Sequence, residues 1–303
     1  MTNRLKKVNE ILAKLHQLKL ETTDAKTIYA INANIDFFES LKSIPRYITW
    51  ILKTTPKLDP ARLLELTDFS FPEYDDQMHT KLIEMERKEF PGLIKLSVNA
   101  IYNFIVEKQH VVLASLGGGA MELERQVIER LKRNNFQGNV TFFAIDLSKS
   151  AIGVAKNNLK SLVIPMRDIA KVNDGEIRKA KNFQGVFQII FCQEDIFHLN
   201  NAVLTVKFDA VYHTLFKHHL TLEQKNLLDE MTRKISDNTF EYDGYRSFFA
   251  MIPQTIIGWS NPVFLNAEIF SNLRFEKKKE IKSTRGNKGT LIFHKAGYYL
   301  LKY

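Results

Sequence analysis

A glycine turn at Gly117, Gly118 and Gly119 is the part of the sequence with the clearest chemical use. It follows an apolar run that begins at Val111, and it precedes an amphipathic stretch that begins at Glu122. A strand that enters a helix through glycines lets backbone amides approach a ligand closely, at the positive end of the helix. The segment therefore predicts a mononucleotide-type pocket, which suits a nucleotide or an adenosyl group.

Two acidic residues follow later apolar runs. Asp146 ends the segment FFAID, and Asp195 ends IIFCQED. The carboxyl ends of neighbouring parallel strands open into one crevice, so these acids and the glycine turn should converge. There Asp146 is placed to bind both ribose hydroxyls, and Asp195 to accept a hydrogen bond from an adenine amino group. Each aspartate alone has the alternative of a turn or capping role, and the order of the three elements carries the prediction.

Two other nucleotide-binding motifs do not fit this glycine turn. The fingerprint of dinucleotide-binding dehydrogenases needs a third glycine where this chain has Glu122, and a carboxylate beside the helix end would repel a pyrophosphate. A P-loop needs Gly-Lys-Ser/Thr, which does not follow the glycines. We therefore expect an adenosyl ligand without phosphate, which points to S-adenosylmethionine.

From Val111 to about Leu220 the chain resembles a class I S-adenosylmethionine-dependent methyltransferase. SLGGGAM is similar to the glycine loop of that family, D-x-G-x-G-x-G, AIDLS to its ribose-binding segment, and QEDIF to its adenine-contacting segment. FDAVYHTLFKHHL is similar to the fourth strand and the loop after it, which in many members ends in His-His-Leu. The resemblance implies an enzyme that transfers a methyl group to an oxygen or nitrogen nucleophile of a small molecule, by in-line displacement.

The resemblance also implies a set of cofactor contacts at the strand ends. They are Ser115, Gly117, Gly118, Gly119, Glu122, Asp146, Leu147, Asp195, Ile196 and Tyr212, although Tyr212 has a place in the core as its alternative. The chain departs from the family at Ser115, where an acid is usual, and at Met121, where the last glycine is usual. The family's acid often helps to hold the methionine amino group, so that contact must be weaker here or come from another residue, such as Glu122.

Three histidines, His213, His218 and His219, lie at or just after the expected fourth strand. Displacement on a sulfonium carbon needs alignment and exclusion of water, and it needs a base only if the nucleophile carries a proton. Histidine is the natural base near neutral pH. His213 is the first candidate, because the resemblance places the end of that strand beside the methyl group. The alternative for each histidine is a packing or hydrogen-bonding role in the loop.

Alternating apolar runs and amphipathic stretches after residue 110 predict an α/β fold, with a doubly wound, mostly parallel seven-stranded sheet. We expect strands at 111–116, 140–145, 186–192, 208–213 and 247–252, and helices at 122–132, 150–159 and 222–235. The segments 275–283 and 290–294, which flank a turn with Gly286, predict an antiparallel C-terminal hairpin.

Residues 1–109 predict an all-helical N-terminal domain, and residues 110–303 a Rossmann-like methyltransferase domain. Apolar residues recur at helical spacing through the first segment, for example Val8, Ile11, Leu12 and Leu15. This segment lies outside the core of the family that the chain resembles. Additions of this kind commonly cap the pocket, so we expect a substrate-selecting cap.

The net charge of +9 is concentrated at the C-terminal end, where residues 246–303 hold 10 Lys and Arg against 3 Asp and Glu. A basic surface attracts phosphate-bearing partners such as nucleic acid. The alternative functions are therefore an RNA or protein methyltransferase that uses the basic C-terminal hairpin, or a catalytically silent adenosyl-binding module. We favour a solvated edge strand whose lysines discourage aggregation, because no pattern of aromatic residues for base stacking is interleaved with the charges.

The remaining composition favours a cytoplasmic enzyme, and the resemblance favours a small-molecule substrate, because a His-His-Leu loop is commoner among small-molecule enzymes of that family. One cysteine, Cys192, excludes an intramolecular disulfide and a cysteine-rich metal site. No apolar run approaches the ~20 residues that cross a bilayer, and the N-terminus has no signal-peptide core. S-adenosylmethionine is the one cofactor that we expect, with no metal, and the sequence does not indicate an oligomeric state.

Overall fold

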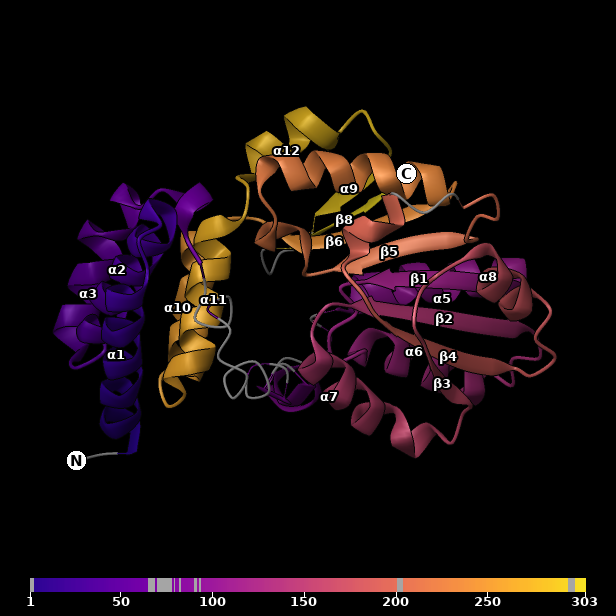
Figure 1. Cartoon of the computed structure of the whole chain (residues 1–303), viewed down its shortest axis with the longest axis horizontal. Coiled ribbons are helices and arrows are strands. Elements are labelled where there is room, and N and C mark those ends of the chain that lie inside the picture. The colour runs from indigo at the N-terminus through magenta and orange to yellow at the C-terminus, as the bar shows by residue number, and fades with distance from the viewer. Residues whose placement is uncertain are drawn as a thin grey trace. The chain divides into compact units, whose positions relative to one another are not determined.

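The computed structural model describes residues 3–64, 69, 78, 80, 81, 83–89, 92, 94–200, 204–293 and 298–303. The chain divides into two compact units (Figure 1), which we call the helical unit, residues 1–78 and 245–277, and the sheet unit, residues 79–244 and 278–303. The sequence placed the boundary after residue 109. Instead, residues 79–109 belong to the sheet unit, and residues 245–277 belong to the helical unit. The helix before β1 packs on the sheet, whereas residues 245–277 pack with the N-terminal helices.

An eight-stranded sheet forms the centre of the sheet unit, in the order β3-β4-β2-β1-β5-β6-β8-β7. The strands are β1 (His110–Leu116), β2 (Asn139–Asp146), β3 (Met166–Ile169), β4 (Phe187–Gln193), β5 (Ala210–Thr214), β6 (Thr239–Gly244), β7 (Thr290–Phe293) and β8 (Tyr298–Lys302). Strands β1 to β6 pair in parallel, and β8 is antiparallel to both β6 and β7. The expected doubly wound sheet with an antiparallel C-terminal hairpin is confirmed, with one strand more than the seven expected.

Helices cover both faces of this sheet. They are α5 (Lys95–Lys108), α6 (Glu122–Arg133), α7 (Lys149–Leu159), α8 (Asp174–Lys181), α9 (Leu222–Ile235) and α12 (Lys278–Arg285), with a π-helical turn η4 (Met85–Glu89) and short 3-10 turns η5 (Lys160–Leu162), η6 (Ile196–Asn200) and η7 (Lys217–His219). One core cluster joins α5, α6 and α7 to the sheet, and another joins α8 and α9 to it. Burial on both faces explains why β1, β2 and β4 are nearly continuous apolar runs.

The helical unit contains α1 (Asn3–Glu21), α2 (Ala25–Ser40), α3 (Ile44–Lys53), α10 (Phe248–Gly258) and α11 (Pro262–Arg274), with short turns η1 (Thr55–Lys57) and η2 (Pro60–Arg62). Its core is aromatic: the Phe37 ring lies 5.5 Å from the Phe270 ring and 5.2 Å from the Trp50 ring, between centroids. Asn266 also donates a buried hydrogen bond of 2.8 Å to Asn34. Segments from both ends of this unit's sequence therefore share one core. No helix among the described residues is long and apolar enough to cross a membrane.

Two sequence predictions of strands were wrong. Residues 247–252 begin helix α10, and the strand of this region is β6, which lies earlier at Thr239–Gly244. A short apolar run fits a buried helix as well as a buried strand, and the acids Glu241 and Asp243 hid the apolar pattern of β6.

The second error concerns the C-terminal hairpin. Residues 278–285 form helix α12, so the hairpin consists of β7 and β8. In α12 the buried side chains are Ile281 and Arg285, one helical turn apart, and the lysines Lys278, Lys279 and Lys282 are exposed. These three lysines, expected on an edge strand, therefore lie on a helix.

Candidate functional site

The glycine turn begins where β1 ends. Gly117 donates a backbone hydrogen bond of 2.9 Å to Ile145 of the neighbouring strand β2. Gly117 and Gly119 have φ angles of 63° and 51°, in the left-handed region that glycine adopts without a steric penalty. Met121 has a φ angle of 53° and precedes the first residue of α6. The methionine that replaces the family's last glycine thus keeps a glycine-like conformation.

Asp146, the last residue of β2, is tied to the glycine turn. Its Oδ2 accepts a hydrogen bond of 2.9 Å from the Gly119 amide, and its Oδ1 accepts one of 2.8 Å from the Ser148 amide. The following residue, Leu147, has 68% of its surface exposed. The structure therefore brings together the two elements that sequence reasoning placed at one edge, with an exposed apolar side chain beside them.

The loop after β4 reaches the same edge. The Glu194 amide donates a hydrogen bond of 3.1 Å to the Asp146 carbonyl. The Asp195 carboxylate accepts a hydrogen bond of 2.9 Å from the Phe197 amide and so also stabilises the turn η6. Ile196 is buried in the core on that side of the sheet. Asp195 thus has the turn-forming role that was its alternative, in a place next to Asp146.

A buried polar cluster of Ser115, Glu124 and Tyr212 lies behind the glycine turn. Ser115 and Tyr212 are register partners on β1 and β5, and the Tyr212 hydroxyl donates a hydrogen bond of 2.6 Å to Glu124 Oε1. Ser115 is hydrogen-bonded to both other members. Burial raises the pKa of the Glu124 carboxyl group, which is 2% exposed.

Sequence reasoning missed Glu124. The sequence did contain a signal for it, because Glu124 lies on the apolar face of α6. Val127, Ile128 and Leu131 follow it at helical spacing on that face. A carboxylate on such a face needs a partner when it is buried.

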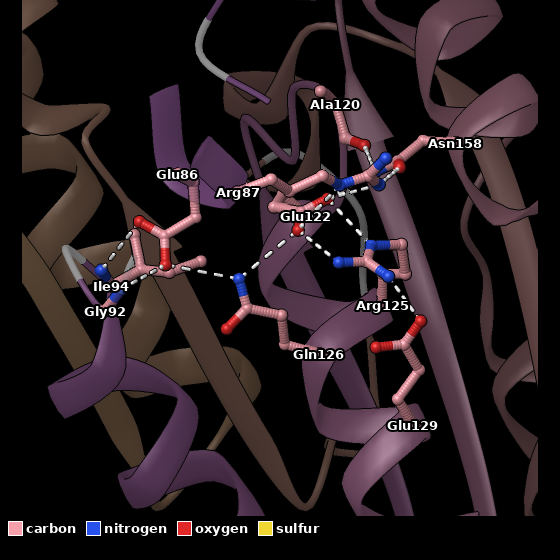
Figure 2. Close-up of polar contacts among 10 residues, drawn as sticks. All are labelled: Glu86, Arg87, Gly92, Ile94, Ala120, Glu122, Arg125, Gln126, Glu129 and Asn158. Carbon is pink, nitrogen blue, oxygen red and sulfur yellow. Dashed lines mark hydrogen bonds and ion pairs between the residues drawn. The ribbon is translucent and has the colours of Figure 1, made fainter. Parts of the chain in front are cut away.

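Glu122, the first residue of α6, lies in a separate polar cluster (Figure 2). Its carboxylate accepts hydrogen bonds from Arg125 Nε (2.9 Å), Arg125 Nη2 (2.6 Å), Arg87 Nη2 (2.9 Å), Asn158 Nδ2 (3.1 Å) and Gln126 Nε2 (3.2 Å). Burial opposes ionisation, but the hydrogen bonds from Arg125 and Arg87 outweigh it and lower the pKa of Glu122. Two guanidinium groups thus surround the residue that was the sequence candidate for the methionine amino group.

The loop after β5 packs against the glycine turn. Leu215 has a φ angle of 53°, and the next side chain, Phe216, lies against Gly117. A Cβ atom added to Gly117 would stand 2.3 Å from Cδ2 of the Phe216 ring. The absence of a side chain at Gly117 is therefore a packing requirement as well as a conformational one.

His213 and His218 differ strongly in their surroundings. His213 is fully buried, and neither ring nitrogen is hydrogen-bonded within the described part of the chain. Burial lowers the pKa of His213 to about 4, against the opposing effect of Glu241. His218, also buried, has its Nδ1 atom 2.8 Å from Asp243 Oδ1 and its amide 2.9 Å from Asp243 Oδ2. Burial opposes ionisation of Asp243, yet the charge of His218 lowers the pKa of this carboxyl group.

His219 completes the histidine loop. Its ring centroid lies 4.0 Å from that of His218, with the two rings tilted by 40°. His218 is thus ordered by a carboxylate, and His219 contacts it, whereas His213 lies on β5 with its Nε2 atom 4.0 Å from Glu241 Oε2 and no hydrogen bond within the described residues.

A buried ionic network of Lys217, Asp229, Glu241, Arg285 and Tyr299 fixes this loop and the C-terminal elements. Lys217 lies 2.9 Å from Glu241 Oε2 and also contacts Asp229. Arg285 of α12 lies 2.8 Å from Glu241 Oε1, to which Tyr299 of β8 also donates a hydrogen bond. One basic residue of the C-terminal end is thus paired inside the fold.

Comparison of the sequence with protein-family models and with curated proteins found no match. Among solved structures, an O-methyltransferase family protein from Burkholderia thailandensis is 11% identical with a TM-score of 0.49, over 93% of this chain and 73% of that one. The magnesium protoporphyrin IX methyltransferase of Synechocystis PCC 6803 with bound SAH is 13% identical with a TM-score of 0.41, over 68% of this chain and 81% of that one. A plantazolicin methyltransferase is 14% identical with a TM-score of 0.44, over 72% and 78%. All three of these solved structures are of methyltransferases.

Proposed function

We propose that this protein is an S-adenosylmethionine-dependent methyltransferase that acts on an oxygen or nitrogen nucleophile of a small molecule. The observation that carries the proposal is the hydrogen bond between Asp146 and the Gly119 amide. It joins a left-handed glycine turn to a carboxylate at the end of the next strand, at the edge where parallel sheets bind ligands.

The residues at this edge fit an adenosyl ligand. Asp146 holds the glycine turn through its carboxylate, and a carboxylate at the carboxyl end of this strand is placed to bind ribose hydroxyls. The exposed Leu147 side chain offers an apolar contact for an adenine ring, with Asp195 and Ile196 on the neighbouring loop. When bound, S-adenosylmethionine supplies a methyl group on a positively charged sulfur, which is already an activated donor.

We assign the role of base to His218 in place of His213. Asp243 holds Nδ1 of His218, which orients the ring and stabilises the positive charge that a proton would bring. Proton transfer from a hydroxyl or amine acceptor would then run through Nε2. His219 contacts the same ring and is assigned to its support. His213 is fully buried, and burial disfavours an added proton there despite the nearby Glu241.

The lysines of α12 and the one just before it favour one second candidate, a methyltransferase for RNA. Lys277, Lys278, Lys279 and Lys282 are exposed, and exposed lysines attract phosphate. Against it, Lys288 lies 3.1 Å from Asp229, and Arg285 is buried in the ionic network. Binding of RNA that weakens steeply with salt would support this second candidate.

A buried single cysteine, Cys192, supports a cytoplasmic setting.

Calorimetry with S-adenosylhomocysteine, the demethylated product of the cofactor, tests the proposal. We expect Asp146→Ala to weaken binding by ~1.5–3 kcal/mol, the loss of charge-assisted hydrogen bonds to the ribose. Asp168→Ala is the matched control, because Asp168 is an exposed carboxylate on β3 that pairs with Lys156, and it should bind like the wild type. A folded wild-type protein that shows no binding heat would end the proposal.

A further inference from the structure

Helices α3 and α10 of the helical unit line an apolar groove, which we call the α3–α10 groove. Ile44, Ile48 and Leu52 recur every fourth residue along α3, and Ile252 and Ile256 do so along α10. All five residues line the groove, and each keeps between 51% and 74% of its surface exposed. Large apolar side chains that gather in one exposed patch mark a binding surface, whereas scattered ones are normal.

The α3–α10 groove has the size of a small-molecule site. Its volume of about 530 Å³ lies within the range of roughly 300–1,000 Å³ that is typical of ligand pockets. On α3 the lining residues run from Ile44 to Leu52, a distance of about 12 Å at 1.5 Å per residue. A stable protein interface takes roughly 20–30 residues on each side, which is more than two short stretches of helix supply. The groove therefore fits a small molecule better than another chain.

Two hydroxyl groups form a polar point in the wall of the groove. The Thr255 hydroxyl donates a hydrogen bond of 2.7 Å to the Met251 carbonyl, so its single hydrogen is already in use. In the 2.8 Å hydrogen bond between Tyr47 and Thr255, the Tyr47 hydroxyl is therefore the donor. The Tyr47 oxygen can still accept a hydrogen bond, which a hydroxyl group on a ligand can donate.

The wall of the groove, as far as the structure describes it, carries no charge. Its lining residues are aliphatic or aromatic side chains, a methionine and a threonine. Burial raises the pKa of Tyr47 to about 12, so this hydroxyl group is neutral at neutral pH. A charged ligand group would lose its water here without gaining an opposite charge. The wall thus selects against carboxylates, phosphates and ammonium groups.

We propose that the α3–α10 groove binds an uncharged aliphatic small molecule, such as a medium-chain alcohol, whose hydroxyl group donates a hydrogen bond to Tyr47. The chain of the ligand lies along the aliphatic side chains of both helices, and removal of this apolar surface from water supplies the affinity. The site goes beyond the proposed function, because all of its lining residues belong to the helical unit.

Calorimetry on the wild-type full chain with decanol and decanoate tests the chemistry of this site. The two probes share the chain length, but decanoate carries a charge above neutral pH. We expect decanol to bind with a dissociation constant on the order of 10–100 µM. Decanoate should bind at least about tenfold more weakly. Absence of decanol binding, or equal affinity for both probes, would overturn the proposal.

Three variants test the location of the site. Ile48→Glu places a carboxylate in the groove at a half-exposed position, so it should weaken decanol binding more than about tenfold and leave the thermal transition nearly unchanged. Tyr47→Phe removes the acceptor and should weaken decanol binding about 2- to 10-fold. Leu20→Glu is the matched control, because Leu20 is an exposed aliphatic residue of α1 outside the groove, and it should bind decanol like the wild type.

Two results with these variants would contradict the proposal. Equal decanol binding by the wild type and Ile48→Glu would show that the alcohol binds elsewhere. A wild-type dimer in sedimentation experiments that Ile48→Glu converts to monomers would show that the groove is an interface between copies of this chain.

Discussion

Gly117 is constrained both by its backbone conformation and by the side chain packed against it. Substitution by alanine, which adds one methyl group, tests both constraints. The φ angle of Gly117 is 63°, and an added Cβ atom would meet the Phe216 ring at 2.3 Å. Gly117→Ala should therefore lower the free energy of unfolding by about 1–3 kcal/mol and weaken S-adenosylhomocysteine binding. Thermal unfolding and calorimetry measure the two effects.

Gly153→Ala is the matched control for this change. Gly153 lies in helix α7, and its added Cβ atom would meet no heavy atom within 4 Å. Because alanine is the better helix former, this variant should gain about 0.5–1 kcal/mol of stability. Equal stability of the two variants would show that the turn at Gly117 tolerates a side chain.

His213 should make the protein less stable in mild acid. The unfolded histidine takes up a proton near its usual pKa of 6.5, whereas burial lowers the folded pKa to about 4. Between these values the unfolded state binds more protons, so stability rises with pH and is lost as pH falls. The loss from this residue between pH 7.5 and 5 should be about 2 kcal/mol.

The comparison of wild type with His213→Leu isolates that contribution. Glu241, Lys217, Asp243 and Asp229 also act on His213. The pKa of Glu241 is itself lowered, because Lys217 and Arg285 outweigh the effect of burial, so this acid adds to the loss at low pH in both proteins. Urea unfolding at the two pH values should show a smaller drop for the variant. An unchanged drop would mean that His213 is protonated in the folded state.

At the scale of single residues, the sequence predicts the positions of those residues that directly follow recognisable strands. Gly117 and Asp146 come after long apolar runs, so their meeting at one edge followed from the pattern. Glu124 was not predicted, because its significance depends on what α6 packs against. The Asp243–His218 pair was equally hidden, because it joins the turn η7 to strand β6, which the sequence did not predict.

At the scale of elements, a buried ionic network joins the elements at the end of the sheet, in addition to the apolar core. Glu241 of β6 is enclosed by Lys217, Arg285 and Tyr299, which belong to η7, α12 and β8. Arg285→Ala would leave this carboxylate with one cation and should lower the free energy of unfolding by about 3 kcal/mol or more. Denaturant unfolding measures the change.

Lys279→Ala is the control for the ionic network. Lys279 also lies on α12 but is exposed, so its loss should change stability by less than about 0.5 kcal/mol. Equal effects of the two substitutions would show that the network around Glu241 does not anchor α12.

In each correctly predicted element, the apolar residues follow a clear pattern that is typical either of a strand or of a helix. Strands β1, β2 and β4 and helices α6, α7 and α9 appear where the apolar pattern placed them. The errors fall where tertiary burial sets the structure: β6 contains buried acids, α10 begins with an apolar run, and α12 has only two buried side chains. Such segments depend on partners that are distant in the sequence.

At the scale of the whole molecule, two distant segments of the sequence build the helical unit. They are the N-terminal helices and residues 245–277, which follow β6. The rings of Phe37 and Phe270 meet in that unit, and Asn34 bonds Asn266. Removal of residues 1–64 would expose the apolar faces of α10 and α11, so the truncated protein should be insoluble or partly unfolded. Soluble yield and the thermal transition measure this outcome. A soluble, cooperatively folded remainder would show that α10 and α11 do not need the N-terminal helices.

The role of the helical unit as a substrate-selecting cap is a proposal that turnover can test. Once an acceptor is identified, substitutions at the surface of this unit should change the KM for the acceptor and leave S-adenosylhomocysteine affinity unchanged. Substitutions that change neither quantity would favour an independent interaction role for this unit.

The crystal structure of the full chain with S-adenosylhomocysteine tests the central claim most directly. We predict that the adenosine lies at the carboxyl edge of β1 and β2, with its ribose on Asp146. Clear ligand density elsewhere on the molecule, or crystals grown at saturating ligand that show none at Gly117–Gly119, would contradict the account.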